Sequence, residues 1–329
     1  MFHVLIIGSG TMGKIHARAY QEMQDVQVAG IVDINNGRAE SLAKQLNCRA
    51  FTTFEDAMEQ TDHVDIVDIC LPTFLHRTYV EKAADAGIHI ICEKPLARNL
   101  EDARSMINYC QSKGVKLFVG HVLRFFPEYK KIKKLIEDGT IGDVGVVRTS
   151  RGGIFPAGVN DWYADFKSSG GLVLDMIIHD FDFLRWCFGE VERVFAKSLH
   201  GRKVERLDYA LVTLRFKNGI IAHVEGTWAH EGFSSAIEVA GKSGIIAFDS
   251  AKEKPLLLRL RGQQAGNRGV EVPESPLRQT PYDLELAHFL SCLQTNSEPI
   301  VSAEDAFKAM EIALAAIESI ETGKPVTIG

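Results

Sequence analysis

The first thirteen residues constrain the fold of this 329-residue chain more than any other segment. An apolar run over residues 4–7 ends in the pattern Gly8-Ser9-Gly10-Thr11-Met12-Gly13. A buried strand that breaks into Gly-x-Gly-x-x-Gly and then a helix is the fingerprint of a dinucleotide-binding unit. The first glycine permits the tight turn, the second lets the backbone approach a pyrophosphate, and the third lets the helix pack closely on the sheet. We therefore expect this segment to bind a dinucleotide at the N-terminus of a helix.

The end of the second predicted strand, over residues 26–32, supports this interpretation. Asp33 follows it, 20 residues after Gly13. An acidic residue at that distance is expected to bind the ribose 2′-hydroxyl, which favours NAD because a carboxylate repels the 2′-phosphate of NADP. Ile34 and Arg38 are expected at the same end of the cofactor, and Arg38 could hold a 2′-phosphate, so NADP stays possible. The alternative is a glycine turn followed by an Asp that only caps the next helix.

The composition excludes several classes of protein. Apolar residues make up 46% of the chain, charged residues 24%, and the net charge is −6, which is ordinary for a globular protein and gives no reason to expect nucleic acid. No apolar run reaches the about 18 residues of a membrane span. Met1 leads straight into a strand without a basic leader, so we expect a cytoplasmic protein. The six cysteines form no Cys-x-x-Cys pair, which predicts reduced thiols and no metal site.

Strand and helix signals alternate through the first third of the chain. Six strands in βα alternation predict an α/β Rossmann domain, a doubly wound parallel sheet with the order 3-2-1-4-5-6. Gly87 and Gly114 stand where helices are expected to end, and Asn99 is a predicted N-cap. The predicted strands cover residues 2–7, 26–32, 49–51, 64–71, 88–92 and 116–120, and the predicted helices 12–23, 38–46, 54–59, 76–86 and 100–113.

After Gly120 the pattern changes. One helix is followed by strand signals without intervening helices, and Asn218-Gly219 between two of them is a strong hairpin signal. This predicts a second, α+β domain with a large, mostly antiparallel open sheet. We therefore place an NAD(P)-binding domain at 1–120 and a substrate-binding domain at 121–329. Its predicted strands cover 144–149, 191–198, 207–216, 220–228, 234–240 and 245–248, and its predicted helices 127–137, 284–292 and 303–321.

Candidate ligand-binding residues of the first domain lie where its strands end, because doubly wound sheets bind ligands beyond the carboxyl ends of their strands. Lys94 is the sharpest of them, since it follows the fifth strand beside a proline that fixes the backbone. The alternative is an ordinary solvated lysine paired with Glu93. The segments at this edge are Leu71-Pro72-Thr73 with His76, Glu93-Lys94-Pro95, and His121 with Arg124.

A second candidate site lies in residues 170–182. A helix here would be apolar nearly all round except for Asp175, His179 and Asp182, at i, i+4 and i+7. Buried polar groups are costly unless they are paired or functional. A histidine titrates near neutral pH, so His179 or Lys94 could take the proton of an alcohol while a nicotinamide accepts its hydride. The alternative is a core histidine satisfied by Asp175.

With these motifs in order, the chain resembles the Gfo/Idh/MocA oxidoreductase family, named for glucose–fructose oxidoreductase and inositol dehydrogenase. The resemblance implies a catalytic set of Lys94, Asp175 and His179. His179 would be the general base, Lys94 would orient the substrate hydroxyl and stabilise negative charge, and Asp175 would hold substrate hydroxyls or tune the pair. The motifs that carry it are Gly8-x-Gly10-x-x-Gly13-x-x-His16, Pro72-Thr73 with His76, Glu93-Lys94-Pro95, Arg124-Phe125, Ser169-Gly170-Gly171, Asp175-x-x-x-His179-Asp180 and the ending Glu321-Thr322-Gly323-Lys324-Pro325-Val326.

The resemblance also implies a carbohydrate-like substrate, such as a sugar, cyclitol, sugar acid or nucleotide sugar, and a homodimer or homotetramer formed through the second-domain sheet. Residues 148–167 are where relatives vary, so Arg151, Trp162 and Tyr163 are candidates for the substrate pocket, together with His121 and Arg124. Both aromatics could equally be packed at the domain junction. Two other functions stay open: a glycoside hydrolase that recycles bound NAD, and a non-catalytic NAD-binding regulator.

Overall fold

The computed structural model describes residues 1–199, 208–252, 256–260 and 279–329. The chain forms two compact units, the first made of residues 1–125 and 278–307 and the second of residues 126–277 and 308–329. From the sequence we expected residues 121–329 to form one domain, whereas residues 278–307 belong with the N-terminal unit. No helix in the described part of the chain has the length and hydrophobicity needed to cross a bilayer.

The first unit contains the predicted doubly wound sheet. Its six strands are parallel, and their order, β3-β2-β1-β4-β5-β6, confirms the predicted topology. The central strands are buried on both faces, so burial is continuous along them rather than alternating, and β4 includes the buried Asp68. The strands are β1 (Phe2–Ile7), β2 (Val26–Val32), β3 (Arg49–Phe51), β4 (Ile66–Ile69), β5 (His89–Glu93) and β6 (Leu117–Gly120).

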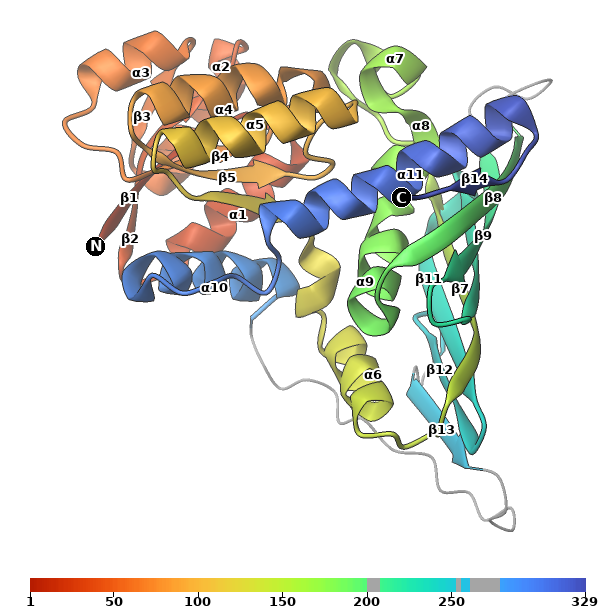
Figure 1. The fold of residues 1–329 in the computed structure, drawn as a ribbon. Coiled ribbons are helices and arrows are strands. Elements are labelled where there is room, and N and C mark those ends of the chain that lie inside the picture. Colours follow the sequence, from red (N-terminus) through yellow and green to blue (C-terminus); the bar gives the residue numbers. More distant parts are fainter. Residues whose placement is uncertain (200–207, 253–255, 261–278) are drawn as a thin grey trace. The chain divides into compact units, whose positions relative to one another are not determined.

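Helices cover both faces of this sheet. Figure 1 shows α4 and α5 on one side and α1 and α10 on the other. The predicted helix ends are confirmed, since Gly87 and Gly114 have φ angles of 72° and 71° and Asn99 accepts a hydrogen bond from the Asp102 N–H. The helices are α1 (Thr11–Gln21), α2 (Asn36–Leu46), α3 (Phe54–Gln60), η1 (Thr73–Leu75), α4 (His76–Asp85), α5 (Leu100–Ser112), η2 (Val122–Phe125) and α10 (Pro281–Thr295).

The helix α10 completes the core of the first unit although it comes from the far end of the chain. Phe289 stacks on Phe118 of β6, with ring centroids 4.9 Å apart and planes at 19°. Leu286 and Leu290 are buried in the same cluster as β1 and α1. A capping box between Thr280 and Asp283 begins the helix.

The second unit is built on an eight-stranded sheet with the order β13-β12-β11-β7-β10-β9-β8-β14. Its neighbouring strands are antiparallel except β7 and β10, which are parallel. The predicted hairpin at Asn218-Gly219 joins β9 to β10. Leu207, the first residue of the strand predicted over 207–216, lies outside the described residues. The strands are β7 (Val144–Ile154), β8 (Val191–Leu199), β9 (Tyr209–Phe216), β10 (Ile221–Thr227), β11 (Ala229–Gly241), β12 (Gly244–Asp249), β13 (Leu256–Leu260) and β14 (Val326–Thr327).

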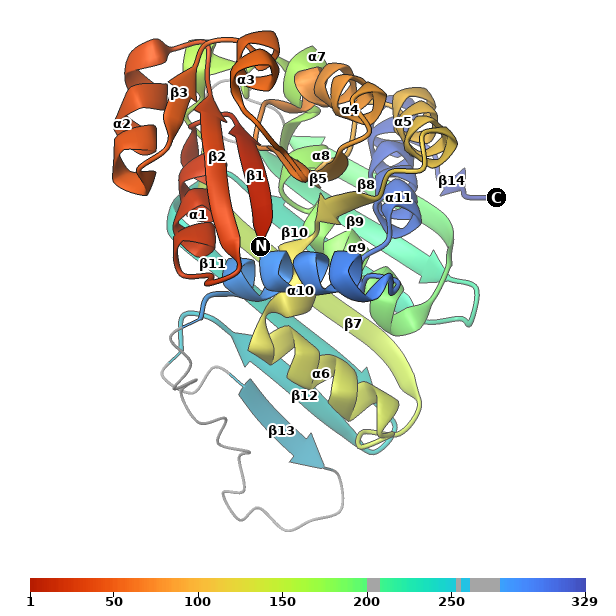
Figure 2. The ribbon, with the colours of Figure 1, turned by 90° about the vertical axis from the view of Figure 1, so that its left-hand side faces the viewer.

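Helices cover one face of this second sheet (Figure 2). Tyr129 of α6 packs against Phe248 of β12, and Ser319 of α11 accepts a hydrogen bond of 3.0 Å from the N–H of Ala196 on β8. The other face is marked by exposed residues that alternate with buried ones along β9. The helices are α6 (Pro127–Glu137), η3 (Val159–Asp161), α7 (Phe166–Ser169), α8 (Gly171–Asp175) and α9 (Ile178–Phe188), with α11 (Ala303–Thr322) running from the first unit into the second.

Candidate active site

The glycine-rich turn between β1 and α1 has the geometry that its sequence predicts. Gly8 has a φ of 101°, and a Cβ on it would overlap the carbonyl oxygen of Cys70. A Cβ on Gly13 would overlap the carbonyl oxygen of Gly8, so only glycine lets α1 approach the turn this closely. A Cβ on Gly10 would meet no atom within 4 Å. The backbone at the N-terminus of α1 is therefore open to a ligand phosphate, and the turn fits a dinucleotide.

Asp33 lies beside this turn at the carboxyl end of β2. Its Oδ2 accepts hydrogen bonds from the N–H and the hydroxyl of Ser9, at 2.9 and 2.6 Å. Its Oδ1 accepts from the N–H of Asn35 and from Nη2 of Arg38, at 2.8 and 3.0 Å. Burial alone would raise the pKa of Asp33, but these four hydrogen bonds lower it overall. Asp33 is therefore a carboxylate that ties the glycine turn to the strand end, and the side chain of Ile34 beside it is 80% exposed.

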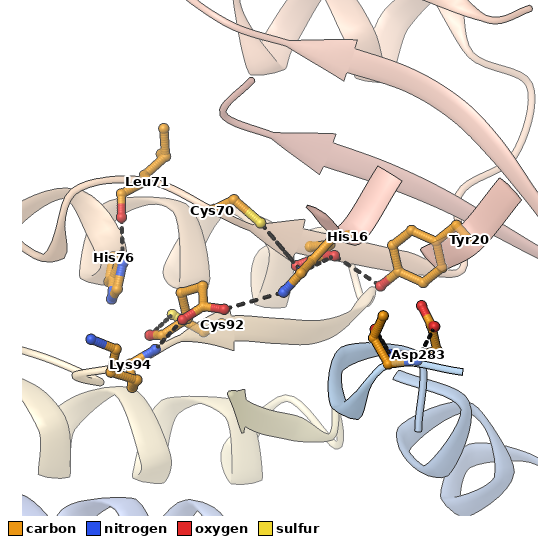
Figure 3. Close-up of polar contacts among 11 residues, drawn as sticks. His16, Tyr20, Cys70, Leu71, His76, Cys92, Lys94 and Asp283 are labelled. Atoms are coloured by element: carbon orange, nitrogen blue, oxygen red, sulfur yellow. Dashed lines mark hydrogen bonds and ion pairs between the residues drawn. The ribbon is translucent and has the colours of Figure 1, made fainter. Parts of the chain in front are cut away.

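His76 holds together the loops that follow β4 and β5. Its ring is fully buried, with Nε2 2.9 Å from the carbonyl oxygen of Leu71 (Figure 3). Nδ1 lies 3.1 and 3.2 Å from the carbonyl oxygens of Pro95 and Leu96. Burial lowers the pKa of this histidine, although the carbonyl groups oppose the shift. Thr73, also buried, lies in the same loop. The direct cofactor contact predicted for His76 stays a prediction, because its ring is engaged with the two loops.

Glu93 and Lys94 lie at the carboxyl end of β5. The Lys94 side chain is half-buried, and its backbone N–H donates a hydrogen bond of 3.1 Å to Oε2 of Glu93. Oε1 of Glu93 lies 3.1 Å from Nε2 of His16, a partner that was not predicted from the sequence. Burial would raise the pKa of Glu93, but the contacts with His16 and Lys94 lower it. The signal that could have found His16 is its place three residues after Gly13, within the glycine-rich motif.

His121 and Arg124, predicted for substrate binding, are both buried after β6. Arg124 donates a hydrogen bond of 2.7 Å to the carbonyl oxygen of Ile300 and lies 3.4 Å from the Asp305 carboxylate. These contacts link the end of β6 to the segment after α10. The geometry favours a structural role for Arg124, and its contact with substrate stays a prediction.

The polar residues predicted on one helix of the second unit lie on two. The chain forms α8 up to Asp175 and begins α9 at Ile178, with Met176 and Ile177 between them. The prediction of one continuous polar stripe at i, i+4 and i+7 is therefore wrong. Asp175 and His179 flank the junction and are half-buried, whereas Asp182 is 1% exposed and belongs to the interior. Asp175 and His179 are thus accessible to solvent, whereas Asp182 is not.

The remaining substrate candidates have partners within the second unit. Arg151 is buried and donates to both oxygens of Asp180, at 2.6 and 3.2 Å. Although burial opposes the charge, Asp180 and Tyr129 raise the pKa of Arg151. Trp162 and Tyr163 stack on each other, with ring centroids 4.0 Å apart. Tyr163 also lines a cavity of about 810 Å³ whose lining does not include Asp175 or His179.

A glycine turn of this geometry on a doubly wound sheet, with a second unit built on an open sheet, defines a two-domain protein with a dinucleotide-binding Rossmann unit. The family models agree. Residues 2–121 match "Oxidoreductase family, NAD-binding Rossmann fold", and residues 133–328 match "Oxidoreductase family, C-terminal alpha/beta domain". The chain belongs to the Gfo/Idh/MocA oxidoreductase family.

Individual relatives extend over nearly the whole chain. The myo-inositol 2-dehydrogenase of Thermotoga maritima is 33% identical over 98% of this chain and 97% of its own length. The inositol 2-dehydrogenase of Rhizobium meliloti is 30% identical over 98% of both chains. A crystal structure of a probable dehydrogenase from Thermotoga maritima, 32% identical, superimposes with a TM-score of 0.83 over 99% of this chain and 98% of its own.

Proposed function

We propose that this protein is an NAD-dependent dehydrogenase that transfers hydride between the nicotinamide and a secondary hydroxyl of a sugar, cyclitol, sugar acid or nucleotide sugar. The observation that carries the proposal is the placement of Lys94 at the carboxyl end of β5, on the same sheet edge as the glycine turn and Asp33. Two relatives with at least 30% identity are named inositol dehydrogenases, which supports a polyhydroxylated substrate.

The residues of the first unit suit NAD. The open backbone at Gly10 and the N-terminus of α1 would hold the pyrophosphate, and the carboxylate of Asp33 would accept hydrogen bonds from the adenosine ribose. The exposed side chain of Ile34 offers an apolar surface to the adenine ring. Arg38 already pairs with Asp33, so we propose NAD as the preferred cofactor and NADP as the weaker one. The other proposed contacts are Ser9, Thr11, Met12, Gly13, Leu71, Pro72, Thr73, His76, Glu93 and Lys94.

The chemistry divides between a hydride and a proton. When bound, the oxidised nicotinamide accepts the hydride of the carbinol carbon. We propose that His179 removes the hydroxyl proton and that the ammonium group of Lys94 stabilises the negative charge that develops on the oxygen. Asp175, half-buried at the end of α8, would orient the substrate through neighbouring hydroxyls. His121, Arg124, Arg151, Trp162 and Tyr163 stay lower-ranked proposals for substrate contact.

The test is reduced-nicotinamide absorbance with the purified protein, NAD or NADP, and a panel of inositols, sugars, sugar acids and nucleotide sugars. Turnover of one substrate class with NAD supports the proposal. Sugar release without net reduced cofactor would instead indicate the NAD-recycling hydrolase. Tight NAD binding with no turnover would indicate the regulator. Neither alternative is favoured, because two relatives that cover nearly the whole chain at 30% identity or more are named dehydrogenases.

We also propose a cytoplasmic homodimer or homotetramer that associates through the outer face of the eight-stranded sheet. Phe195, Leu199 and Leu211 lie on that face and are 37%, 49% and 41% exposed. Lys197, two residues after Phe195 on β8, is paired with Leu211 on β9. The side chains of Phe195, Leu199 and Leu211 therefore lie in two neighbouring rows on the same face. Apolar side chains gathered on one face are typical of an interface. Light scattering of the purified protein tests the assembly, and a monomer would contradict it.

A further inference from the structure

A buried cluster of charged groups lies beneath the candidate active-site edge of the first unit. His16 of α1 is fully buried, and each of its ring nitrogens faces a carboxylate. Nδ1 lies 2.9 Å from Oδ2 of Asp68 on β4, and Nε2 lies 3.1 Å from Oε1 of Glu93 on β5 (Figure 3). Two buried carboxylates need a cation or several hydrogen bonds. Nδ1 makes a hydrogen bond to Asp68, whereas the approach of Nε2 to Glu93 is an ion-pair contact without hydrogen-bond geometry. A buried ring between two carboxylates is favoured as an imidazolium, because opposite charges this close stabilise the protonated form.

The Asp68 side of the cluster is held by further donors. The hydroxyl of Tyr20 donates a hydrogen bond of 2.8 Å to Oδ2 of Asp68, and the Cys70 thiol lies 3.6 Å from Oδ1. Burial and the charge of Asp68 raise the pKa of Cys70 to about 12, so this thiol stays neutral. From α10, the ring of Tyr282 lies 6.4 Å from that of His16. Burial and the charge of Asp68 raise the pKa of Tyr20, and the charge of Glu285 on α10 adds to this shift. The Asp68 end is thus held by donors from α1 and from the end of β4, and α10 packs beside it.

The Glu93 side of the cluster leads to Lys94. The second carboxylate oxygen of Glu93 accepts the backbone N–H of Lys94. The same carboxylate packs against Gly120 of β6, where an added Cβ would lie 3.2 Å from Oε1. Glu93 therefore has little room to move, and its carboxylate connects the buried ring of His16 to the residue proposed to stabilise the substrate oxygen.

We propose that His16 is a positioning residue for Lys94, a buried imidazolium that fixes the Glu93 carboxylate and, through it, the backbone of Lys94. The expected effect of His16 on the reaction rate rests on the proposed dehydrogenase function, whereas the contacts among His16, Glu93 and Lys94 are independent of it. The opposing interpretation is a core histidine that contributes stability only. The two interpretations predict different rates for a variant that loses the charge of His16 and keeps the fold.

The protonation of His16 makes the proposed anchoring of Lys94 depend on pH. Burial opposes protonation of His16, but Asp68 and Cys70 outweigh it and raise the pKa of the ring well above that of an ordinary histidine. The ion pairs therefore contribute fully below the ordinary histidine pKa and are lost as the pH rises through the raised value. Glu93, with a lowered pKa, keeps its charge down to acidic pH. We expect the anchoring of Lys94 to persist from mildly acidic pH to beyond neutrality and to weaken only in alkali.

The experiment combines His16→Gln with two companions. Tyr20→Phe is the matched control, because it removes another buried hydrogen bond to Asp68 and leaves the link to Glu93 in place. The double variant His16→Gln/Glu93→Gln removes both charges. We expect His16→Gln to lower kcat about 10-fold or more with little change in the KM for NAD, since small misplacements of a catalytic group are costly. Tyr20→Phe should lower the melting temperature while kcat stays within about 2-fold, and the double variant should recover part of kcat.

A spectroscopic readout keeps the test independent of turnover. Selective nitrogen-15 labelling reports whether both His16 nitrogens are protonated at neutral pH, and whether the Lys94 amide signal shifts with the same alkaline transition. If no substrate turns over, the proposed function fails, but the spectroscopic measurement still tests the positioning role. The same measurement tests that role if the His16→Gln variant does not fold, because it is made on the unaltered protein. A neutral ring at pH 7, or equal kcat losses in His16→Gln and Tyr20→Phe, would overturn the proposal.

Discussion

The two sheets of this protein place polar chemistry in different surroundings. The parallel sheet is covered on both faces, and the burial of β4 is continuous, whereas β9 in the second unit alternates between buried and exposed residues. Charges inside the first unit, such as His16 and Glu93, therefore have fixed partners at bonding distance. In the second unit, Asp175 and His179 are half-buried beside a break between two short helices.

This difference indicates how cofactor binding and substrate binding are divided between the two units. An unpaired charge that is buried away from water is costly, so the buried polar groups of the first unit are held in one arrangement. Such an arrangement suits the binding of one and the same cofactor. Half-buried groups at a helix junction tolerate different neighbours, which suits substrates that vary. We therefore expect substitutions of the buried, paired polar groups of the first unit to affect cofactor binding and stability together, and substitutions of Asp175 and His179 to affect turnover with little loss of stability.

The largest effect should come from the catalytic candidates. Lys94→Ala and His179→Ala should each lower kcat about 100-fold or more, the range for a positioned acid, base or charge. Exposed residues of the same types serve as controls, with Lys44→Ala in the first unit and His230→Ala in the second. Steady-state rates at saturating NAD measure the effect, and melting temperatures check the fold. Near-normal rates in both variants would remove the proposed roles.

The glycine turn allows stability and cofactor affinity to be separated. Gly13→Ala places a methyl group against the Gly8 carbonyl and should destabilise the first unit by about 1–3 kcal/mol. Gly10→Ala meets open space, so it should leave the melting temperature unchanged and weaken NAD binding about 10-fold through contact with the phosphates. Thermal unfolding without cofactor and calorimetric titration with NAD measure the two effects. Equal behaviour of the two variants would contradict the assigned geometry.

Cofactor selection should depend on Asp33. Asp33→Ala removes the carboxylate that would bind the ribose and frees Arg38 to approach a 2′-phosphate. We expect the ratio of kcat/KM for NAD over NADP to fall about 10-fold or more, as for the loss of a hydrogen bond to a charged group. Glu59→Ala, an exposed change on α3, is the control. An unchanged ratio would show that Asp33 serves only to hold Ser9 and the turn.

Much of the first unit could be predicted because its signals are local. The glycine pattern fixes β1 and α1, and right-handed crossovers then limit the strand order. The break between Asp175 and Ile178 escaped prediction because neither Met176 nor Ile177 is a helix breaker. The two-residue strand β14 is too short to show periodicity.

The partners of buried groups were harder to predict than the elements. His16 bonds to Asp68, 52 residues away, and periodicity says nothing about such pairs. The same reason explains why α10 was assigned to the second domain, although Phe289 stacks on Phe118. For the site, the candidate residues were predicted from motifs and stay predictions, whereas the contacts of His76, Arg124 and Arg151 required the fold.

The smallest expected effect on stability concerns the outer face of the second sheet. Leu211 is 41% exposed, so Leu211→Glu should change the free energy of unfolding of a single chain by no more than about 0.5 kcal/mol. If this face is an interface, the same substitution places a charge in it and should shift the protein to a smaller species in light scattering. Lys217→Glu, an exposed change just after β9, is the control for added negative charge. An assembly that survives Leu211→Glu would place the interface elsewhere, because a charge buried at the centre of an apolar contact is costly.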